Sequence, residues 1–355
     1  MRRTDPLILG GGPAGSAAAI ALAQAGARPV LIERHEHPRD IVCGAFLGWD
    51  ALAALERLGV DPWALGARPI ERVRLVAGDK AVERQLPRRA AGLSRGTLDA
   101  ALLERAATLG VELQRGVTVR RLDGDTVHLG DGTSLAADSI FLATGKHALR
   151  GSPREALPAD TRLGLRTTLP PQPDLAGWIE LHLFAGGYVG LLAQEDGLTN
   201  LCLSVAAERL AHAGSPERLL AELAQAARRL ADRLGEGAGA WAAVAGVPYG
   251  WRARTTAAGL FRLGDQAAVI ASVVGDGIAI ALASGIAAAQ AWAKGGPAAA
   301  PAFQRAFAAR AWRPIGLAEL ARAAAERPRL AARVMPLMRV PGALAALARL
   351  TRIGH

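Results

Sequence analysis

The apolar and polar residues at the start of the chain follow a strand pattern, then a helix pattern, then a strand pattern again. The apolar run from Leu7 to Leu9 predicts a short buried strand, because strands of a parallel sheet are apolar on both faces. An alanine-rich run from about Pro13 to Ala25 predicts a helix, and Pro29 to Ile32 predicts a second strand. This order predicts a βαβ unit with parallel strands.

Helical spacing and short strand patterns alternate after this unit. Helices are predicted over Trp49 to Leu58 and about Thr97 to Leu109. Turn residues separate a series of short strand patterns, which lie at 72–76, 81–86, 111–113, 117–122 and 126–129. The last three of these predict a small antiparallel meander inserted in a parallel-sheet domain. A further buried strand, Ser139 to Ala143, ends at Thr144-Gly145, and ligands gather at such carboxyl ends.

The pattern changes between about residues 151 and 247, where prolines accompany alternating strands and one helix that Ser215 caps and Pro216 starts. In the strand at 179–184, aliphatic residues alternate with Glu180, His182 and Phe184, which predicts one aliphatic and one mixed face. The parallel-sheet pattern returns at 259–265, before a long helix at 277–294. The first domain is therefore expected to be discontinuous.

These elements predict an α/β fold. Residues 1–150 and 248–296 are expected to form a discontinuous Rossmann-like domain, and 151–247 an inserted antiparallel β-sheet domain that binds the substrate. Residues 297–355 are expected to be a C-terminal helical region. Prolines should break its helices, at Pro314, Pro328, Pro336 and Pro341.

Composition narrows the classes of protein. With 355 residues and 51% apolar content, the chain can bury a large core. Two cysteines, Cys43 and Cys202, are too few for a disulfide framework or a metal cluster, so we expect no bound metal and a reducing, cytoplasmic location. No secretory signal is expected at the start of the chain. The apolar run at 277–293 is rich in Ala and Gly, which favours a buried helix over a membrane span.

The net charge of +10 is concentrated at the C-terminus. Residues 310–355 hold nine arginines against Glu319 and Glu326, which gives +7 for this segment. Because basic residues are not interleaved with aromatic residues across the chain, a nucleic-acid partner is not expected. Peripheral contact of this segment with a membrane is expected as the alternative to ordinary packing, because apolar residues accompany the arginines. These apolar residues are Val334, Leu337, Met338, Leu344, Leu347 and Leu350.

The loop between the first strand and the first helix carries a dinucleotide-binding pattern. Gly10, Gly12 and Gly15 have the spacing GxGxxG, with Pro13 and Ala14 completing the turn into the helix. The glycines serve, in order, a tight turn, close approach of backbone to a pyrophosphate, and close helix–strand packing. Glu33 ends the second strand eighteen residues after Gly15, where a carboxylate can accept from a ribose hydroxyl.

Three separated segments together resemble the FAD-dependent superfamily of p-hydroxybenzoate hydroxylase-type (group A) flavin monooxygenases and geranylgeranyl reductase-like enzymes. The glycine loop with Glu33-Arg34 resembles the ADP-binding end. Ser94-Arg95 before Leu98-Asp99 resembles an Arg-x-x-Leu-Asp element whose arginine lies along FAD. A last group resembles the Gly-Asp motif and the loop before the final cofactor helix; its residues are Gly264, Asp265, Gly275 and Gly277.

The resemblance implies bound FAD, with Arg95, Thr144 and Gly145 also at the cofactor. No second glycine fingerprint occurs, so NAD(P)H is expected as a transient reductant. The leading interpretation is a monooxygenase acting on an apolar aromatic or polyketide-like small molecule. The alternative is a reductase that saturates C=C bonds of a prenyl or lipid chain, and a third reading is a non-catalytic flavin-binding protein at a membrane.

Some motifs favour the monooxygenase interpretation and others favour the reductase interpretation. Thr144-Gly145 and Ser272 depart from the monooxygenase pattern, whereas Cys43-Gly44 resembles the reductase-like branch. Catalytic side chains stay unassigned, because flavin itself performs the difficult step. The substrate-side candidates are Cys43, His182, Tyr188, Tyr249 and Trp251.

Overall fold

A parallel sheet of five strands forms the centre of one lobe. The computed structural model describes residues 2–3, 6–154, 162–235 and 239–353. The sheet has the order β17-β11-β2-β3-β7, and neighbouring strands are parallel throughout. The strands are β2 (Leu7–Leu9), β3 (Val30–Glu33), β7 (Glu112–Arg115), β11 (Ile140–Leu142) and β17 (Leu260–Arg262). Since β17 follows the second lobe in sequence, this domain is discontinuous, as predicted.

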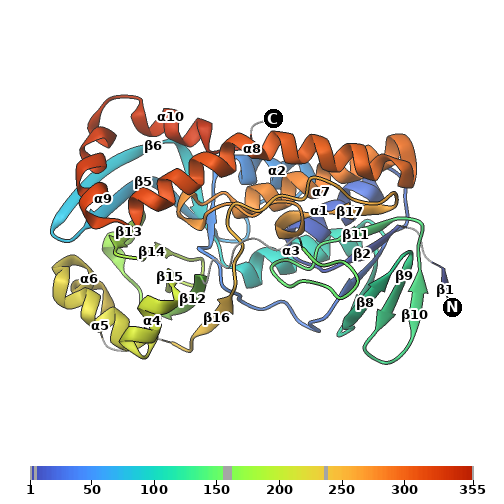
Figure 1. Cartoon of the computed structure of the whole chain (residues 1–355), viewed down its shortest axis with the longest axis horizontal. Helices are drawn as coiled ribbons and strands as arrows, with labels where there is room; N and C mark the ends of the chain where they lie inside the picture. Colours follow the sequence, from blue (N-terminus) through green and yellow to red (C-terminus); the bar gives the residue numbers. More distant parts are fainter. Residues whose placement is uncertain (1, 4–5, 155–161, 236–238, 354–355) are drawn as a thin grey trace.

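Helices cover this sheet and bring the candidate loops together. They are α1 (Pro13–Gln24), α2 (Trp49–Leu58), α3 (Arg95–Thr108) and α7 (Gly277–Gly295). Figure 1 shows α1 and α7 side by side, with the long α8 (Ala300–Ala325) above them. Gly285 permits this close packing, because a Cβ there would lie 2.3 Å from the carbonyl oxygen of Ala14. The N-termini of α1 and α7 thus belong to one packed unit.

The predicted antiparallel meander is present beside the parallel sheet. It consists of β8 (Val119–Asp123), β9 (Thr126–Leu129) and β10 (Ser134–Ala136), and β1 (Arg2–Arg3) pairs with β10 in parallel. The predicted strand at 111–113 instead corresponds to β7 and joins the parallel sheet.

The second lobe is built on a sheet of eight strands in the order β16-β12-β15-β14-β13-β5-β6-β4. Its strands are β4 (Phe46–Leu47), β5 (Arg68–Ala77), β6 (Lys80–Gly92), β12 (Arg162–Leu169), β13 (Gly177–Phe184), β14 (Gly187–Ala193), β15 (Thr199–Ala206) and β16 (Ala242–Ala245). The expected domain division differs here, because β4, β5 and β6 come from within residues 1–150. Long-range pairing of β5 with β13 places them in this sheet.

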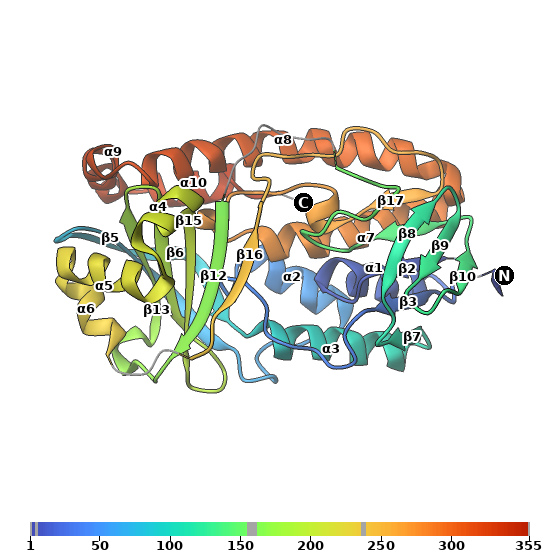
Figure 2. The ribbon, with the colours of Figure 1, turned by 60° about the horizontal axis from the view of Figure 1, so that its bottom comes forward.

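The two faces of this large sheet have different neighbours. One face packs against α5 (Pro216–Ala226) and α6 (Arg228–Leu234), through a core that includes Leu191, Leu203 and Leu219. Ser215 caps α5 as predicted. Figure 2 shows α5 and α6 beside the strands, with α4 (Ala207–Ala213) at their end. Because side chains alternate along a strand, Arg166, Asn200 and others on the opposite face point toward the first lobe.

The C-terminal region is helical and runs along both lobes (Figure 1). It comprises α8 (Ala300–Ala325), α9 (Pro328–Val334), a 3-10 turn at Met335–Arg339 and α10 (Ala343–Leu350). The expected break at Pro314 is wrong, since Pro314 is buried inside α8. Tertiary packing along the length of α8 compensates for the backbone hydrogen bond that proline cannot make. The segment 277–325 is long and apolar enough to span a membrane, but half of its apolar window is buried.

Candidate functional site

The three glycines of the N-terminal loop are constrained in different ways. Gly10 has φ +109°, and a Cβ there would lie 2.5 Å from the carbonyl oxygen of Ala143. At Gly15 a Cβ would lie 1.9 Å from the carbonyl oxygen of Gly10. A Cβ at Gly12, by contrast, would meet only Arg95 Nη2, at 3.4 Å, within 4 Å. Gly10 and Gly15 therefore permit backbone packing, and Gly12 leaves space in front of the helix end.

The N-terminus of α1 is open toward that space. Gly12 is its N-cap and has no side chain, Pro13 is its first residue, and the first turn holds no acidic residue. Ala14, also buried, lies at the same helix end. Free N–H groups at a helix N-terminus bind anions, and the helix dipole favours negative charge there. This end can therefore hold a pyrophosphate.

Glu33 lies at the end of β3 beside the glycine loop. Its Oε2 accepts from the N–H of Gly11 at 2.7 Å, and its Oε1 accepts from the N–H of His35 at 2.9 Å. A carboxylate has further lone pairs, which a ribose hydroxyl can use. Arg34 is next in sequence, and its Nη2 lies 3.3 Å from His147 Nε2, which connects β3 with the loop after β11.

Arg95 is the first residue of α3 and forms a two-point ion pair with Asp99. Its Nε and Nη2 donate to the carboxylate of Asp99 at 2.9 and 2.7 Å. Burial lowers the pKa of Arg95, but the charge of Asp99 outweighs it, and the pKa is raised above its ordinary value. The guanidinium thus stays charged beside Gly12; that it lies along FAD stays a prediction.

The loops after β11 and β17 are joined by hydrogen bonds. Gln266 Nε2 donates to the carbonyl oxygens of Gly145 and His147 at 2.7 and 2.8 Å. Thr144 Oγ1 donates to the carbonyl of His147 at 3.1 Å, which closes the turn. The N–H of Gly264 donates to Ser284 Oγ on α7 at 2.8 Å. The predicted positions Thr144, Gly145, Gly264 and Asp265 therefore lie at one edge of the parallel sheet.

Asp265 has a basic partner in this arrangement. Its Oδ2 lies 3.2 Å from Lys146 Nζ, and the charge of Asp265 raises the pKa of Lys146 above its ordinary value. The side chain of Asp265 keeps 26% of its surface exposed, and that of Lys146 keeps 31%. An ionised carboxylate that is still accessible can accept from a hydroxyl group.

The loop at 275–277 precedes α7. Gly275 has φ +76°, a left-handed conformation in which a Cβ would lie 2.8 Å from the ring of Phe46. At Gly277 a Cβ would meet nothing within 4 Å. The backbone of this loop can therefore be approached by a planar group, with Gly275 fixing the turn.

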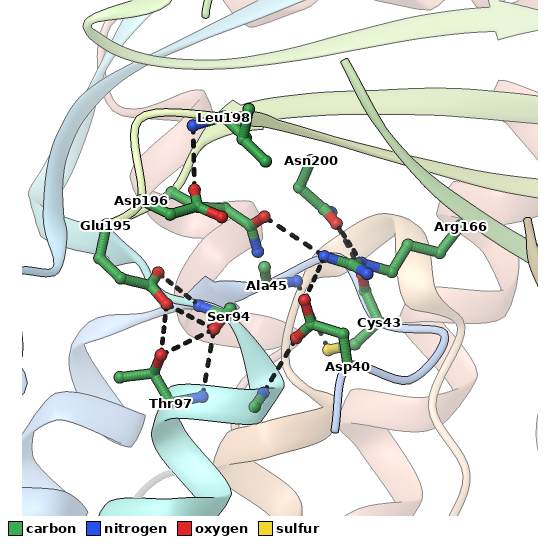
Figure 3. Close-up of polar contacts among 12 residues, drawn as sticks. Asp40, Cys43, Ala45, Ser94, Thr97, Arg166, Glu195, Asp196, Leu198 and Asn200 are labelled. Carbon is green, nitrogen blue, oxygen red and sulfur yellow. Dashed lines mark hydrogen bonds and ion pairs between the residues drawn. The ribbon is translucent and has the colours of Figure 1, made fainter. Parts of the chain in front are cut away.

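A polar network that the sequence analysis missed joins the two lobes (Figure 3). Arg166 on β12 donates to Asp40 Oδ2 at 2.6 Å and to Asn200 Oδ1 at 2.8 Å. Asp40 also accepts from the N–H of Gly96 at 2.9 Å, and Asn200 donates to the carbonyl oxygen of Cys43 at 3.2 Å. A period of two relates alternate residues of one strand only, so it could not bring Arg166, Asn200 and Asp40 together.

A second connection lies next to it in Figure 3. Glu195 Oε1 accepts from the hydroxyls of Ser94 and Thr97, both at 2.5 Å, and Oε2 accepts from the N–H of Ser94 at 2.9 Å. Ser94 is the N-cap of α3. Glu195 from the turn between β14 and β15 therefore fixes the start of the helix that carries Arg95.

The segment around Cys43 has strained backbone. Ala45 has φ +56°, which is uncommon for a non-glycine residue and costs about 1–2 kcal/mol. Its N–H donates to Cys43 Sγ at 3.4 Å, and its side chain is 2% exposed. Strain of this kind persists where surrounding contacts over-determine the backbone, often at ligand sites.

Two of the substrate-side candidates meet at the loop before α7. Tyr188 Oη donates to Ser272 Oγ at 2.7 Å, and Tyr249 Oη lies 2.6 Å from the same oxygen. Burial raises the pKa of both tyrosines, so both phenols stay protonated. Cys43 also lies on this side of the large sheet, because its carbonyl oxygen accepts a hydrogen bond from Asn200 Nδ2.

The other two candidates do not contact Ser272, although Trp251 belongs to the apolar cluster against which Tyr249 packs. His182 is buried on the opposite side of the strand, where its Nε2 lies 2.8 Å from Glu180 Oε1. Trp251 is 5% exposed and packs in a small apolar cluster with Val247 and Val269. Core packing explains why Trp251 is buried, and the ion pair with Glu180 explains why His182 is buried.

The described residues fit FAD. Space lies in front of Gly12 and Gly277, uncapped helix ends lie at α1 and α7, and accessible carboxylates belong to Glu33 and Asp265. These features supply, in one sheet edge, what a pyrophosphate, a ribose and a ribityl chain require.

Comparison with known proteins agrees with this geometry. Residues 3–131 match a family model described as FAD binding domain. Menaquinone reductase of Mycolicibacterium smegmatis is 30% identical over 160 residues, which cover 42% of this chain and 39% of that protein. AqdB1 of Rhodococcus erythropolis, named as a candidate 2-heptyl-3-hydroxy-4(1H)-quinolone synthase, is 32% identical over 192 residues, covering 50% of this chain and 49% of that protein. The match thus spans half or less of both relatives.

The likeness of the fold extends further. PqsL of Pseudomonas aeruginosa, solved with 2-aminobenzoylacetate, has a TM-score of 0.73 and 19% identity, covering 94% of this chain and 100% of that chain. The likeness to PqsL, at 19% identity, shows a common fold, and the match of residues 3–131 to an FAD binding domain agrees with FAD as the cofactor.

Proposed function

We propose that the protein is an NAD(P)H-dependent monooxygenase that hydroxylates or oxidises an apolar aromatic or polyketide-like small molecule. The observation that carries this proposal is the meeting of Tyr188 and Tyr249 at Ser272 Oγ, three residues before Gly275. Each phenol has a single proton, and that of Tyr188 is donated to Ser272 Oγ. With the Ser272 hydroxyl donating to Tyr249 Oη, the Tyr249 phenol can donate to a phenolic or carbonyl oxygen of a substrate and so orient an aromatic ring with respect to the flavin.

The face of the large sheet around these tyrosines suits such a substrate. Gly190 lies between Leu181 and Tyr188, since a Cβ there would be 3.3 Å and 3.7 Å from their side chains. Leu181 supplies apolar surface, and Arg166 with Asn200 supplies polar surface on the neighbouring strands β12 and β15. An apolar molecule with one or two oxygen atoms matches this combination.

The chemistry divides between cofactor and protein. FAD, when reduced by NAD(P)H, supplies the electrons that activate O₂. One oxygen atom then enters the substrate as a hydroxyl group and the other leaves as water, while NAD(P)H becomes NAD(P)⁺. Tyr249 would donate to the substrate oxygen and keep its own proton, while Tyr188 donates to Ser272 and so positions Tyr249. NAD(P)H would bind only transiently, because the glycine fingerprint at 10–15 serves FAD.

A reductase is the second candidate. Cys43-Gly44 resembles the reductase-like branch, and a Cβ at Gly44 would meet nothing within 4 Å, so substrate can approach there. Relatives of this chain include a menaquinone reductase. In this case a hydride and a proton would add across a C=C bond of a prenyl or lipid chain, with NAD(P)H as the source of the hydride.

Product mass distinguishes these candidates. Protein loaded with FAD would be incubated with NAD(P)H and ¹⁸O₂, with menaquinone or an alkylquinolone as the substrate. Incorporation of one ¹⁸O atom supports the monooxygenase, whereas addition of two hydrogen atoms without ¹⁸O supports the reductase. Tight FAD without NAD(P)H consumption would instead favour the non-catalytic reading. Tyr249→Phe should lower incorporation, and Tyr249→Ala should lower it further.

We also propose a cytoplasmic protein with peripheral membrane contact through the C-terminal helices. Among the described residues, the exposed large apolar side chains all lie between residues 312 and 350; they are Trp312, Leu320, Leu330, Leu337, Val340 and Leu350. Exposed arginines accompany them, including Arg333 and Arg339. This combination suits an anionic bilayer, from which an apolar substrate could reach the second lobe.

A further inference from the structure

The N-terminus of α7 carries an aspartate where aspartate usually caps a helix. Asp276 is the N-cap, and its carbonyl oxygen accepts the first helical hydrogen bond, from the N–H of Ile280 at 3.0 Å. A carboxylate at this position ordinarily accepts from the N–H of the second or third helical residue. Asp276 makes no such side-chain bond, although its side chain is only 2% exposed. The usual capping group is therefore turned away from this helix end.

Arg352 accounts for the direction of the Asp276 side chain. Its Nη1 lies 2.9 Å from Asp276 Oδ1 and 3.7 Å from Asp50 Oδ2, and its guanidinium carbon lies 3.5 Å from the centre of the Trp49 ring. Burial raises the pKa of Asp276 to about 7; the charge of Arg352 opposes this rise, and that of Asp50 adds to it. The guanidinium thus gives Asp276 a charged partner in place of the helix N–H groups.

Residues 351–353 pack into the core, which keeps the Arg352 side chain in place. Thr351, Arg352 and Ile353 are buried, with 3%, 9% and 6% of their surface exposed. Ile353 belongs to the large core of the FAD domain, and Arg310 Nη2 on α8 donates to its carbonyl oxygen at 3.3 Å. Gly48 leaves the space that the guanidinium fills, because a Cβ there would lie 2.4 Å from Arg352 Nη1.

We propose that Arg352 is a positioning residue that keeps the N-terminus of α7 open for the flavin, by holding the carboxylate of Asp276 away from the helix N–H groups. The inference rests on the proposed placement of FAD at the loop 275–277. The helix end carries partial positive charge, which stabilises the negative charge that reduction places on a flavin. A carboxylate capping this end would occupy its donors and cancel that charge.

Four variants test this role: Arg352→Gln, Arg352→Lys, Asp276→Ala and the double variant Arg352→Gln with Asp276→Ala. Arg349→Gln, which alters an exposed arginine three residues earlier, is the matched control. The FAD dissociation constant of each apoprotein and the reduction potential of its bound flavin would be measured. Thermal unfolding of the apoproteins would verify that each variant is folded.

Arg352→Gln should weaken FAD binding about tenfold and make the potential more negative, because the freed carboxylate caps α7. The double variant should recover most of the lost affinity, since no carboxylate remains to cap the helix. Arg352→Lys and Asp276→Ala should stay close to the unaltered protein. Recovery in the double variant separates positioning from loss of packing, which a second truncation would only worsen.

A double variant that binds FAD as weakly as Arg352→Gln would overturn the proposal, and so would an unchanged potential in Arg352→Gln. Loss of FAD in Asp276→Ala would also overturn it, because the carboxylate would then be a flavin ligand itself. If Arg352→Gln does not fold, loss of FAD in Asp276→Ala would still overturn the proposal. The ¹⁸O experiment tests the monooxygenase proposal separately, so the two can fail independently.

Discussion

Single residues of the glycine loop have distinct steric surroundings, and these decide what each substitution does. Gly12→Val should fold but bind no FAD, because the added side chain meets Arg95 and fills the space in front of α1. Gly15→Ala should fail to fold, since its Cβ would overlap the carbonyl oxygen of Gly10 at 1.9 Å. Gly316→Ala in α8, where a Cβ meets nothing within 4 Å, is the control. FAD content by absorbance and thermal unfolding give the readouts; stoichiometric FAD in Gly12→Val would contradict the assignment.

Asp265 provides a second test at this scale. Asp265→Ala should weaken FAD binding by at least about tenfold, because hydrogen bonds to an ionised acceptor contribute roughly 1.5–3 kcal/mol each. It should also lower the pKa of Lys146, which Asp265 raises. Asp131→Ala, at an exposed turn of the meander, is the control. Titration of apoprotein with FAD gives the result, and an unchanged dissociation constant would show that Asp265 does not contact the cofactor.

At the scale of elements, one buried carboxylate joins β13 to β5 and α6. Glu180 is fully buried. Its carboxylate accepts from Arg74 at 2.5 Å and from Arg233 at 3.0 Å, and it lies 2.8 Å from His182 Nε2. Glu180→Gln should destabilise the protein by about 3–5 kcal/mol, because it leaves buried arginines without their shared partner. Glu222→Gln, which removes an exposed pair with Arg209, should cost at most about 1 kcal/mol. Denaturant unfolding measures both, and equal costs would contradict the prediction.

The same cluster predicts a pH dependence. Burial raises the pKa of Glu180, but hydrogen bonds from His182, Arg233 and Arg74 outweigh it, and the pKa is lowered. A carboxyl whose pKa is lower in the folded state contributes stability above its unfolded pKa of about 4.3, and this stability is lost as the pH falls further. The free energy of unfolding should therefore decrease as the pH falls below about 4. That of the Glu180→Gln variant should decrease less over the same pH range, because the variant lacks this carboxyl group. Parallel pH profiles for both proteins would refute this assignment.

For the whole molecule, the C-terminal helices are the surface to test. Co-sedimentation should show binding to anionic liposomes that falls steeply with salt, because each arginine near such a surface contributes around 1 kcal/mol. Of the apolar residues expected to face the membrane, Leu337 and Leu350 are exposed, at 57% each. Arg333→Glu with Arg339→Glu should reduce binding, whereas Arg228→Glu with Arg229→Glu on α6 should not. Equal or absent binding to anionic and neutral liposomes would leave these helices as ordinary packing.

The local parts of the fold could be predicted from the sequence. The helix over Trp49–Leu58 has the predicted bounds, Ser215 caps α5, and the glycine spacing predicted the turn into α1. These features depend on neighbours within a few residues, through hydrophobic period, capping and steric exclusion at glycine. The flavin motifs are also short segments, and their role at the cofactor stays a prediction.

Contacts between distant segments were decided only by the tertiary structure. Asp40 and Arg166 are 126 residues apart in sequence, and β5 pairs with β13 across a similar interval, so local spacing carried no signal for either. Pro314 stays inside α8 because packing along the helix outweighs the local preference for a break. Arg352 reaches Asp276 because the last buried residues fold back onto α2 and α7. The sequence by itself determined the short glycine and Gly-Asp motifs for which FAD binding is proposed; the tertiary structure determined which side chains surround them, because burial and charge pairing depend on the whole chain.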